Sequence, residues 1–443
     1  MTTRTAIHPD RVQEILNRHL LVDGYPLILD LERSEGSRLV DEQTGRSYID
    51  FFTFFASNPL GMNHPKLRAD ADFMQRLTAA ALNKISNPDI YTTQLARFVD
   101  TFSRVGIPDY LPHAFFVSGG ALAVENALKT AMDWKVRKNI QQGRSAELGT
   151  QVLHLEQAFH GRSGYTMSLT NTEHVKVEHF PKFDWPRIVN PKANVPLTPE
   201  NLQSIEQSER QALDQAKQHF QQRKHDIGCV IAEPIQGEGG DNHFRPEFLR
   251  ALRDLAHEND ALLIFDEVQT GVGLTGTFWA HQQLGVEPDI LAFGKKAQVC
   301  GILAGPRIDE VEDNVFQLSS RINSTWGGNL VDMVRFDRIL EIIEEDKLVE
   351  NAAQVGRYLL DGLRAIADEH PTVANPRGRG LMCAFDLPDG KRRDEVRDTC
   401  YKQGLMILGC GDRSLRFRPA LTVTTDVIDE GLTILRNVLK ATA

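Results

Sequence analysis

Short apolar runs alternate with amphipathic helical patterns along most of the chain, and this alternation limits the fold more than any other feature. Continuous apolar runs are typical of strands buried on both faces, and the helical patterns between them supply the cover. The sequence therefore predicts an α/β fold with a mostly parallel central sheet, whose ligands bind at the carboxyl ends of the strands. The predicted strands are His113–Val117, Gln151–Leu155, Cys229–Ala232, Ala261–Phe265 and Ile290–Phe293, and two predicted helices are Val124–Lys135 and Arg245–His257.

The length of 443 residues exceeds what one hydrophobic core usually organises. We expect a large domain over residues 61–330 and a smaller α+β domain over residues 331–443, with residues 1–60 packed against the small domain. Inside the large domain, Asn171–Pro199 is rich in proline and has no period, which predicts a long ordered loop. The predicted elements of the small domain are helices Val331–Glu345 and Val349–His370 and strands near Gly380–Asp386 and Leu415–Pro419.

The charge balance and the hydropathy exclude several classes of partner. Fifty basic residues against sixty acidic ones give a net charge of −10, which argues against nucleic-acid binding. No apolar run approaches the roughly 18 residues of a membrane helix, and the polar N-terminal residues do not form a signal peptide. Five cysteines without a C-x-x-C pair fit reduced thiols. We expect a cytoplasmic protein that binds neither membrane nor nucleic acid.

Three polar sites follow predicted strands. Ser118–Ala121 forms a small-residue turn into a helix, whose N-terminus suits a phosphate. Asp266 ends a buried strand and needs a positive partner there. Lys295 follows another strand, where desolvation would make it a nucleophile that forms imines. Each site also has an ordinary interpretation: a turn with Ser118 as N-cap, a helix cap, and a solvated loop lysine.

Other chemistries are not supported by the spacing of residues. A phosphate-binding P-loop around Lys295 would need glycine at position 289 and serine or threonine at position 296, where the chain has Asp289 and Lys296. Gly271–Gly276 matches G-x-G-x-x-G, but the helical pattern begins after the glycines, so we reject a dinucleotide site. The fourteen histidines are dispersed and no metal-ligand spacing occurs, so we expect no metal.

Five motifs occur in order along the chain, and together they resemble the class III ω-aminotransferases, a family of pyridoxal 5'-phosphate (PLP) enzymes of fold type I. The resemblance runs from about Tyr48 to the C-terminus. It implies PLP as the cofactor, bound in the large domain, and a homodimer whose active sites are shared between subunits. The motifs are Ser118–Ala121, Phe159–Arg162, Ala232–Gly240, Asp266–Gly271 and Lys295.

The resemblance assigns the two central cofactor contacts. Lys295 matches the family's Schiff-base lysine, whose free amine also moves the substrate proton, and the neighbouring Lys296 is the rival. Asp266 matches the carboxylate that pairs with the pyridinium nitrogen and keeps the ring an electron sink.

The remaining cofactor contacts are also implied by the family. Gly120 and Ala121 match the backbone phosphate cup. Phe159 would stack on the ring, and Gln269 would hydrogen-bond its hydroxyl group. Thr325 matches a phosphate contact that the neighbouring subunit donates.

Four residues match the family's substrate contacts. Arg162 matches the residue that binds the carboxylate distant from the reacting amine, and Asn323 is a weaker match for a contact to the far end of the substrate. Arg416 matches the arginine for the α-carboxylate of 2-oxoglutarate, with Arg418 as the near alternative. Glu238 matches a switch carboxylate that pairs with this arginine and swings aside when 2-oxoglutarate arrives.

Within the family, FGKKAQVCG and RINSTWGGN are most similar to the lysine 6-aminotransferases. Leu274 and Ala297–Cys300, where many members have arginine and a glycine-rich stretch, also resemble that branch. The implied reaction is a ping-pong transfer of the ε-amino group of L-lysine to 2-oxoglutarate. The alternative donors are 4-aminobutyrate and ornithine. A non-catalytic PLP-binding regulator is disfavoured, since the first sixty residues show no basic helix-turn-helix.

Overall fold

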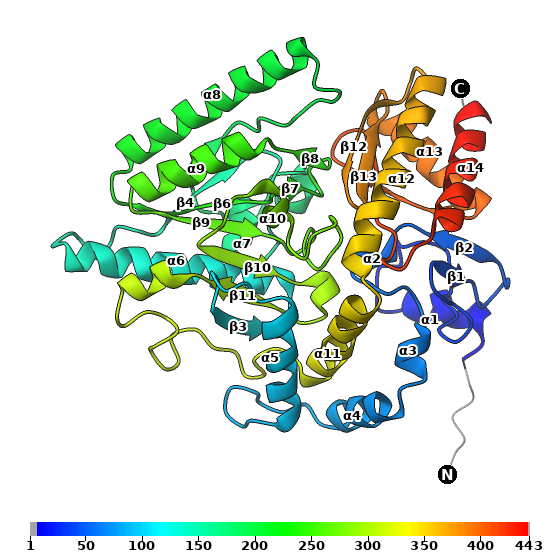
Figure 1. Ribbon diagram of the computed structural model, residues 1–443, viewed down its shortest axis with the longest axis horizontal. Coiled ribbons are helices and arrows are strands. Elements are labelled where there is room, and N and C mark those ends of the chain that lie inside the picture. The colour runs from blue at the N-terminus through cyan, green and yellow to red at the C-terminus, as the bar shows by residue number, and fades with distance from the viewer. Residues whose placement is uncertain (1–6, 442–443) are drawn as a thin grey trace.

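The computed structural model describes residues 7–441 and confirms the predicted α/β architecture (Figure 1). Its main sheet has seven strands in the order β3-β11-β10-β9-β6-β4-β5. Three of the predicted strands keep their bounds, and β6 and β9 differ by one or two residues at their ends. The strands are β3 (His113–Val117), β4 (Gln151–Leu155), β5 (Arg187–Ile188), β6 (Ile227–Ala232), β9 (Leu262–Asp266), β10 (Ile290–Phe293) and β11 (Cys300–Ala304).

Two strands of this sheet were not predicted, the edge strand β5 and the inner strand β11. β11 runs antiparallel to both β10 and β3, whereas β10, β9, β6, β4 and β5 pair in parallel. β11 follows β10 after a short connection that carries Lys295, and it pairs with β10 in the opposite direction. The sequence pattern did not separate the residues of β11 from this connection. The other six strands all point the same way, so their carboxyl ends lie at one edge.

Helices cover both faces of the main sheet (Figure 1). Alternate side chains of a strand point to opposite faces, and the two faces form different cores. Ile231 and Ile264 pack with the apolar side of α6, whereas Val230 and Leu263 pack with α8 and α9. The helices of this part are α6 (Gly120–Gln141), α7 (Gly164–Leu169), α8 (Pro199–Gln222), α9 (Pro246–Glu258) and α10 (Ala280–Leu284).

A second, antiparallel sheet lies in the C-terminal part, with the strand order β12-β13-β16-β15. Helix α12 packs against β12 and β13 and against α14, and α11 packs against α4 and α5. The elements are α4 (Ala71–Leu82), α5 (Thr93–Val105), α11 (Leu330–Glu345), α12 (Leu348–Glu369), β12 (Ala374–Arg379), β13 (Met382–Asp386), α13 (Gly390–Gln403), β15 (Leu408–Cys410), β16 (Ser414–Phe417) and α14 (Thr425–Ala441).

The N-terminal strands join this C-terminal part. β1 (Arg38–Val40) pairs with β2 (Ser47–Asp50), and β2 pairs in parallel with β14 (Leu405–Met406). Figure 1 shows the N-terminal elements beside α14. The division into domains, with the packing of residues 1–60 against the small domain, stays a prediction. The short N-terminal helices are α1 (Val12–Leu16), α2 (Thr53–Ala56) and α3 (Pro65–Arg68).

The segment expected to be one long loop, Asn171–Pro199, contains two short elements. They are a 3₁₀ turn at His174–Lys176 and the two-residue strand β5 at the edge of the main sheet. Elements of two or three residues are too short to give a hydrophobic period, which is why the pattern missed them. Within residues 7–441, no helix is both long and apolar enough to cross a membrane.

Candidate active site

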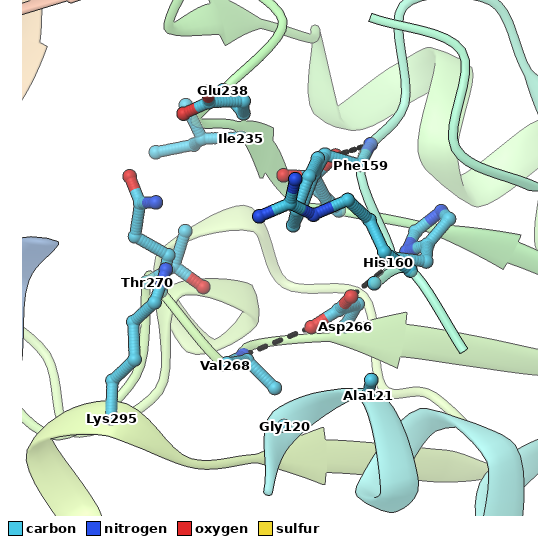
Figure 2. Close-up of a pocket in the computed structure, with 14 residues that line it drawn as sticks. Gly120, Ala121, Phe159, His160, Ile235, Glu238, Asp266, Val268, Thr270 and Lys295 are labelled. Atoms are coloured by element: carbon cyan, nitrogen blue, oxygen red, sulfur yellow. Dashed lines mark hydrogen bonds and ion pairs between the residues drawn. The ribbon is translucent and has the colours of Figure 1, made fainter. Parts of the chain in front are cut away.

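A cavity of about 300 Å³ opens at the carboxyl edge of the main sheet, within the usual size range of small-molecule sites (Figure 2). Figure 2 shows Lys295 and Asp266 approaching it from different walls, with Gly120 and Ala121 below and Phe159 and Glu238 above. The predicted site residues that line it are Gly120, Ala121, Phe159, Arg162, Glu238, Asp266, Gln269 and Lys295.

The direction of the strands explains why these residues meet. Asp266 is the last residue of β9, Lys295 follows β10 by two residues, and Glu233 directly follows β6. Since these strands run in parallel, residues that are 29 to 62 positions from one another in the sequence reach the same edge. The cavity is therefore assembled by the sheet.

The N-terminus of α6 forms the floor of the cavity. Gly119, not Ser118, takes the N-cap position with a φ of +113°, and no side chain caps the helix. The N-cap interpretation of Ser118 is therefore wrong, and the first N–H groups of α6 are left for a ligand. Neighbouring glycines keep the approach open: a Cβ on Gly161 would lie 2.6 Å from the Cβ of Ala121. An uncapped helix N-terminus favours an anion such as a phosphate.

Asp266 is held by a histidine that the sequence analysis did not single out. The Oδ2 atom of Asp266 lies 2.8 Å from Nδ1 of His160, and its Oδ1 atom accepts a hydrogen bond from Val268 N at 3.1 Å. Both side chains are buried. His160 was visible inside the Phe159–Arg162 motif, but the sequence does not say which way its ring points.

Glu233 is a second buried carboxyl group that was missed. Its Oε1 atom accepts from Phe159 N at 2.9 Å, and its Oε2 atom accepts from Gly237 N at 3.1 Å. Burial raises the pKa of Glu233 to about 7. The side chain thus ties the Phe159 loop to the loop that carries Glu238. The rule that selected Asp266, an acidic residue ending a buried strand, would also have selected Glu233.

The structure separates the two neighbouring lysines. Lys296 is fully buried, and its Nζ donates to the carbonyl oxygens of Gln269 at 2.6 Å and Ala56 at 3.2 Å. Lys295 instead lines the cavity. Desolvation, followed by the nearby Arg416 guanidinium, lowers the pKa of Lys295 to about 8. Lys295 is therefore the lysine that suits a nucleophile and proton carrier.

The two neighbouring arginines are separated in the same way. Arg418 is buried in an ion pair with Asp241 and also donates to Oε1 of Gln269 at 3.0 Å. Arg416 is 2% exposed and donates from Nη2 to Glu238 at 2.8 Å. Its Nε and Nη1 have no hydrogen-bond partner in the described part of the chain. Buried N–H groups without a partner are costly, so Arg416 is the arginine with capacity for a substrate carboxylate.

Glu238 lies between two cations. Its Oε2 atom contacts Arg416, and its Oε1 atom lies 2.6 Å from Nζ of Lys176. Burial alone would raise the pKa of Glu238, but Arg416 and Lys176 outweigh it and lower the pKa to about 2. Lys176 was not predicted, because it belongs to the irregular segment that gave no pattern.

Three predicted residues do not line the cavity of their own chain. One is Arg416, which contacts the cavity-lining Glu238 instead. Asn323 and Thr325 are exposed and lie in the segment before α11, and neither lines the cavity. Arg162 does line it and is exposed at the opening. The roles predicted for Arg162, Asn323, Thr325 and Arg416 remain predictions.

The lowered pKa of Lys295 gives a testable prediction. The neutral, reactive fraction of its amine should rise as the pH passes through about 8, below the ordinary lysine value of 10.5. The measurement is the rate of trinitrobenzenesulfonate labelling of the cofactor-free enzyme against pH, followed for each lysine by peptide mapping. Exposed lysines in the same sample serve as the control. A labelling midpoint of Lys295 that coincides with theirs would contradict the desolvated environment.

Comparisons with known proteins agree with this geometry. The family model described as aminotransferase class-III matches residues 22–439. An L-lysine-epsilon aminotransferase of Mycobacterium tuberculosis is 58% identical over 97% of this chain and 96% of the relative. A mitochondrial 4-aminobutyrate aminotransferase of Homo sapiens is 31% identical, over 94% of this chain and 86% of the relative.

A solved structure is similar over the whole length. It is described as lysine aminotransferase from M. tuberculosis in the internal aldimine form, and it has a TM-score of 0.97 and 57% identity, covering 99% of this chain and 100% of that chain. The family resemblance read from five motifs is thereby confirmed. The chain belongs to the class-III aminotransferases, a family that depends on PLP.

Proposed function

We propose that the protein transfers the ε-amino group of L-lysine to 2-oxoglutarate, which gives 2-aminoadipate 6-semialdehyde and L-glutamate. The observation that carries this proposal is the meeting of Lys295, Asp266 and the uncapped N-terminus of α6 in one cavity. A nucleophilic amine, a buried carboxylate and an anion site are the three groups that PLP requires of a protein.

The cavity residues fit PLP in kind and in order. Gly120 and Ala121 would hold its phosphate, Asp266 its ring nitrogen, and Phe159 one face of its ring. Gln269 uses Oε1 to accept from Arg418, so its amide N–H groups are directed elsewhere and would meet the ring hydroxyl. When bound, PLP supplies an electron sink for the carbon next to the reacting nitrogen.

The protein itself supplies the proton transfer. With a pKa of about 8, the Nζ atom of Lys295 both accepts and releases a proton near neutral pH. His160 contacts Asp266 through Nδ1 at 2.8 Å, and this contact orients the buried carboxylate toward the cofactor site. In the proposed reaction, Lys295 moves the proton and His160 positions Asp266, and neither step calls for a metal.

Arg416 and Glu238 address a problem that the two substrates pose. The terminal amine of lysine has no carboxylate beside the reacting carbon, whereas 2-oxoglutarate has one. Glu238 would neutralise Arg416 during the first half-reaction and release it to 2-oxoglutarate in the second. The unpartnered Nε and Nη1 of Arg416 support this, because a carboxylate accepts from two guanidinium N–H groups at once. Arg162 and Asn323 would contact the distant end of either substrate.

The comparisons favour lysine over the alternative donors. The relative named for lysine is 58% identical, whereas the one named for 4-aminobutyrate is 31% identical. Donors such as ornithine differ from lysine by one methylene, which changes binding by only about 1–3 kcal/mol. The choice of donor therefore needs a direct measurement.

We predict that L-lysine converts the absorption spectrum of the PLP-loaded enzyme to that of the amine form of the cofactor, and that 2-oxoglutarate restores it. Identification of the cyclised semialdehyde then shows that the ε-nitrogen moved. If 4-aminobutyrate or ornithine changes the spectrum and lysine does not, the protein is still an aminotransferase, but the proposal that lysine is the amino donor is wrong.

A second prediction concerns the switch. Replacing Glu238 with Ala or Gln leaves Arg416 without its carboxylate, so α-amino acids should compete better with terminal amines. We expect the preference for the ε-amino group to fall by roughly tenfold or more, in line with the loss of a partly buried charge pair. Rates with lysine and with L-glutamate, measured in single turnovers, give this preference. An unchanged preference in both variants would rule out the switch.

We also propose a homodimer with shared sites. Large apolar side chains are exposed on two segments that meet where Asn87 donates to the Trp326 carbonyl, next to Thr325. Clustered exposed apolar side chains indicate a surface that a partner covers. They are Leu82, Ile90, Tyr91 and Trp326, which are 75%, 66%, 79% and 45% exposed. A cytoplasmic location fits the five free, buried cysteines.

Complementation tests the shared site. A Lys295→Ala chain and a Thr325→Glu chain should each be inactive, the second because a carboxylate repels the phosphate. After mixing and reassembly, half of the dimers are hybrids, and one of their two sites is intact only if Thr325 serves the neighbouring subunit. Recovery of about a quarter of the wild-type activity is expected. No recovery would mean that Thr325 serves its own chain or neither.

A further inference from the structure

Lys176 lies against the predicted switch without an assigned role. It ends the 3₁₀ turn His174–Lys176, and its side chain is 16% exposed. Its Nζ lies 2.6 Å from Oε1 of Glu238 and 5.4 Å from the ring centroid of Phe159. The other charged group at its amine is Glu173, 3.1 Å away and 52% exposed. Lys176 thus contacts two residues that line the cavity, although it belongs to the irregular segment outside the sheet.

We propose that Lys176 is a positioning residue that acts through Glu238, and that it keeps the Glu238 carboxylate paired when a substrate α-carboxylate takes Arg416. This inference rests on the proposed function, because it assumes that a keto acid such as 2-oxoglutarate binds Arg416. It makes Lys176 a determinant of the second half-reaction.

The number of charges in the site supports the proposal that Lys176 favours the release of Glu238 from Arg416. Without a keto acid, Arg416 and Lys176 share the carboxylate of Glu238. The second carboxylate at Lys176, that of Glu173, is 52% exposed and screened by solvent, so in the buried part of the site two cations face one anion. The incoming α-carboxylate brings the balance to two cations and two anions. Without Lys176 the pair of Arg416 and Glu238 is already balanced, and the new carboxylate adds an uncompensated charge in a largely buried site. Lys176 therefore favours the state in which Glu238 has left Arg416.

The geometry allows Glu238 to move without losing its partner. Its two oxygens already contact different cations, Oε1 on Lys176 and Oε2 on Arg416. Breaking the contact to Arg416 therefore leaves the contact to Lys176 in place. A lysine suits this role because its amine is a point charge on a flexible stem, which follows a moving carboxylate.

The test compares Lys176→Met with wild type in single turnovers, with L-lysine and with 2-oxoglutarate in separate experiments. The apparent affinity for 2-oxoglutarate should fall by about tenfold relative to that for lysine. Lys182→Met is the matched control, because Lys182 lies in the same segment but donates to the carbonyls of Val177 and Phe180. The proposal is wrong if Lys176→Met lowers the apparent affinity for both substrates equally, or if Lys182→Met has the same effect. Either result would mean that Lys176 only stabilises the fold of its segment.

A double-mutant cycle with Glu238→Gln completes the test. When Glu238 carries no charge, Lys176→Met should no longer affect 2-oxoglutarate. If it still weakens 2-oxoglutarate, Lys176 binds the substrate directly and the proposal is wrong. If the wild type reacts with 2-oxoglutarate and Lys176→Met has the same apparent affinity for it, only the inference about Lys176 is wrong. If the wild type does not react with 2-oxoglutarate, the proposed amino acceptor is wrong, and the inference about Lys176 fails with it.

Discussion

Six strands of the main sheet run in one direction, and the candidate site depends on that constraint. Each parallel strand delivers the residues after it to the same edge, so Asp266, Lys295 and Glu233 meet although they are far apart in the sequence. The antiparallel β11 does not disturb this arrangement, because it pairs between β10 and β3 and leaves their ends at the common edge. The helix that starts after β3 adds its uncapped N-terminus there.

The buried charges around the cavity are paired in a way that leaves two groups available. Arg418 is neutralised by Asp241, Asp266 is paired with His160, and Lys296 is satisfied by backbone carbonyls. Buried charges require such partners. Within the described residues, the amine of Lys295 lines the cavity, and Nε and Nη1 of Arg416 have no hydrogen-bond partner, so both side chains can take part in the chemistry. Because Lys296 and Arg418 are already bound to other groups, Lys295 and Arg416 are the lysine and the arginine that remain available.

Much of the fold and of the site could be predicted because the patterns are local. The strand before Asp266, the apolar face of α6 and the order of the motifs are all visible in the sequence. Other features could not be predicted from it. The N-cap at Gly119 depends on a positive φ, and the partners of His160 and Glu233 depend on which way their side chains turn after the strands end. β5 and β11 were missed because one is two residues long and the other resembles a loop.

The sequence alone determined the α/β class and the family, and it predicted eight of the residues that line the cavity, because periodicity and motif order are properties of the chain itself. Motif order already favoured Lys295 over Lys296 and Arg416 over Arg418, but only the tertiary structure showed how the surroundings of each pair differ. It also brought Lys176 to Glu238. The reason is physical: pairing and desolvation of a charge are set by groups that are distant in sequence and close in space.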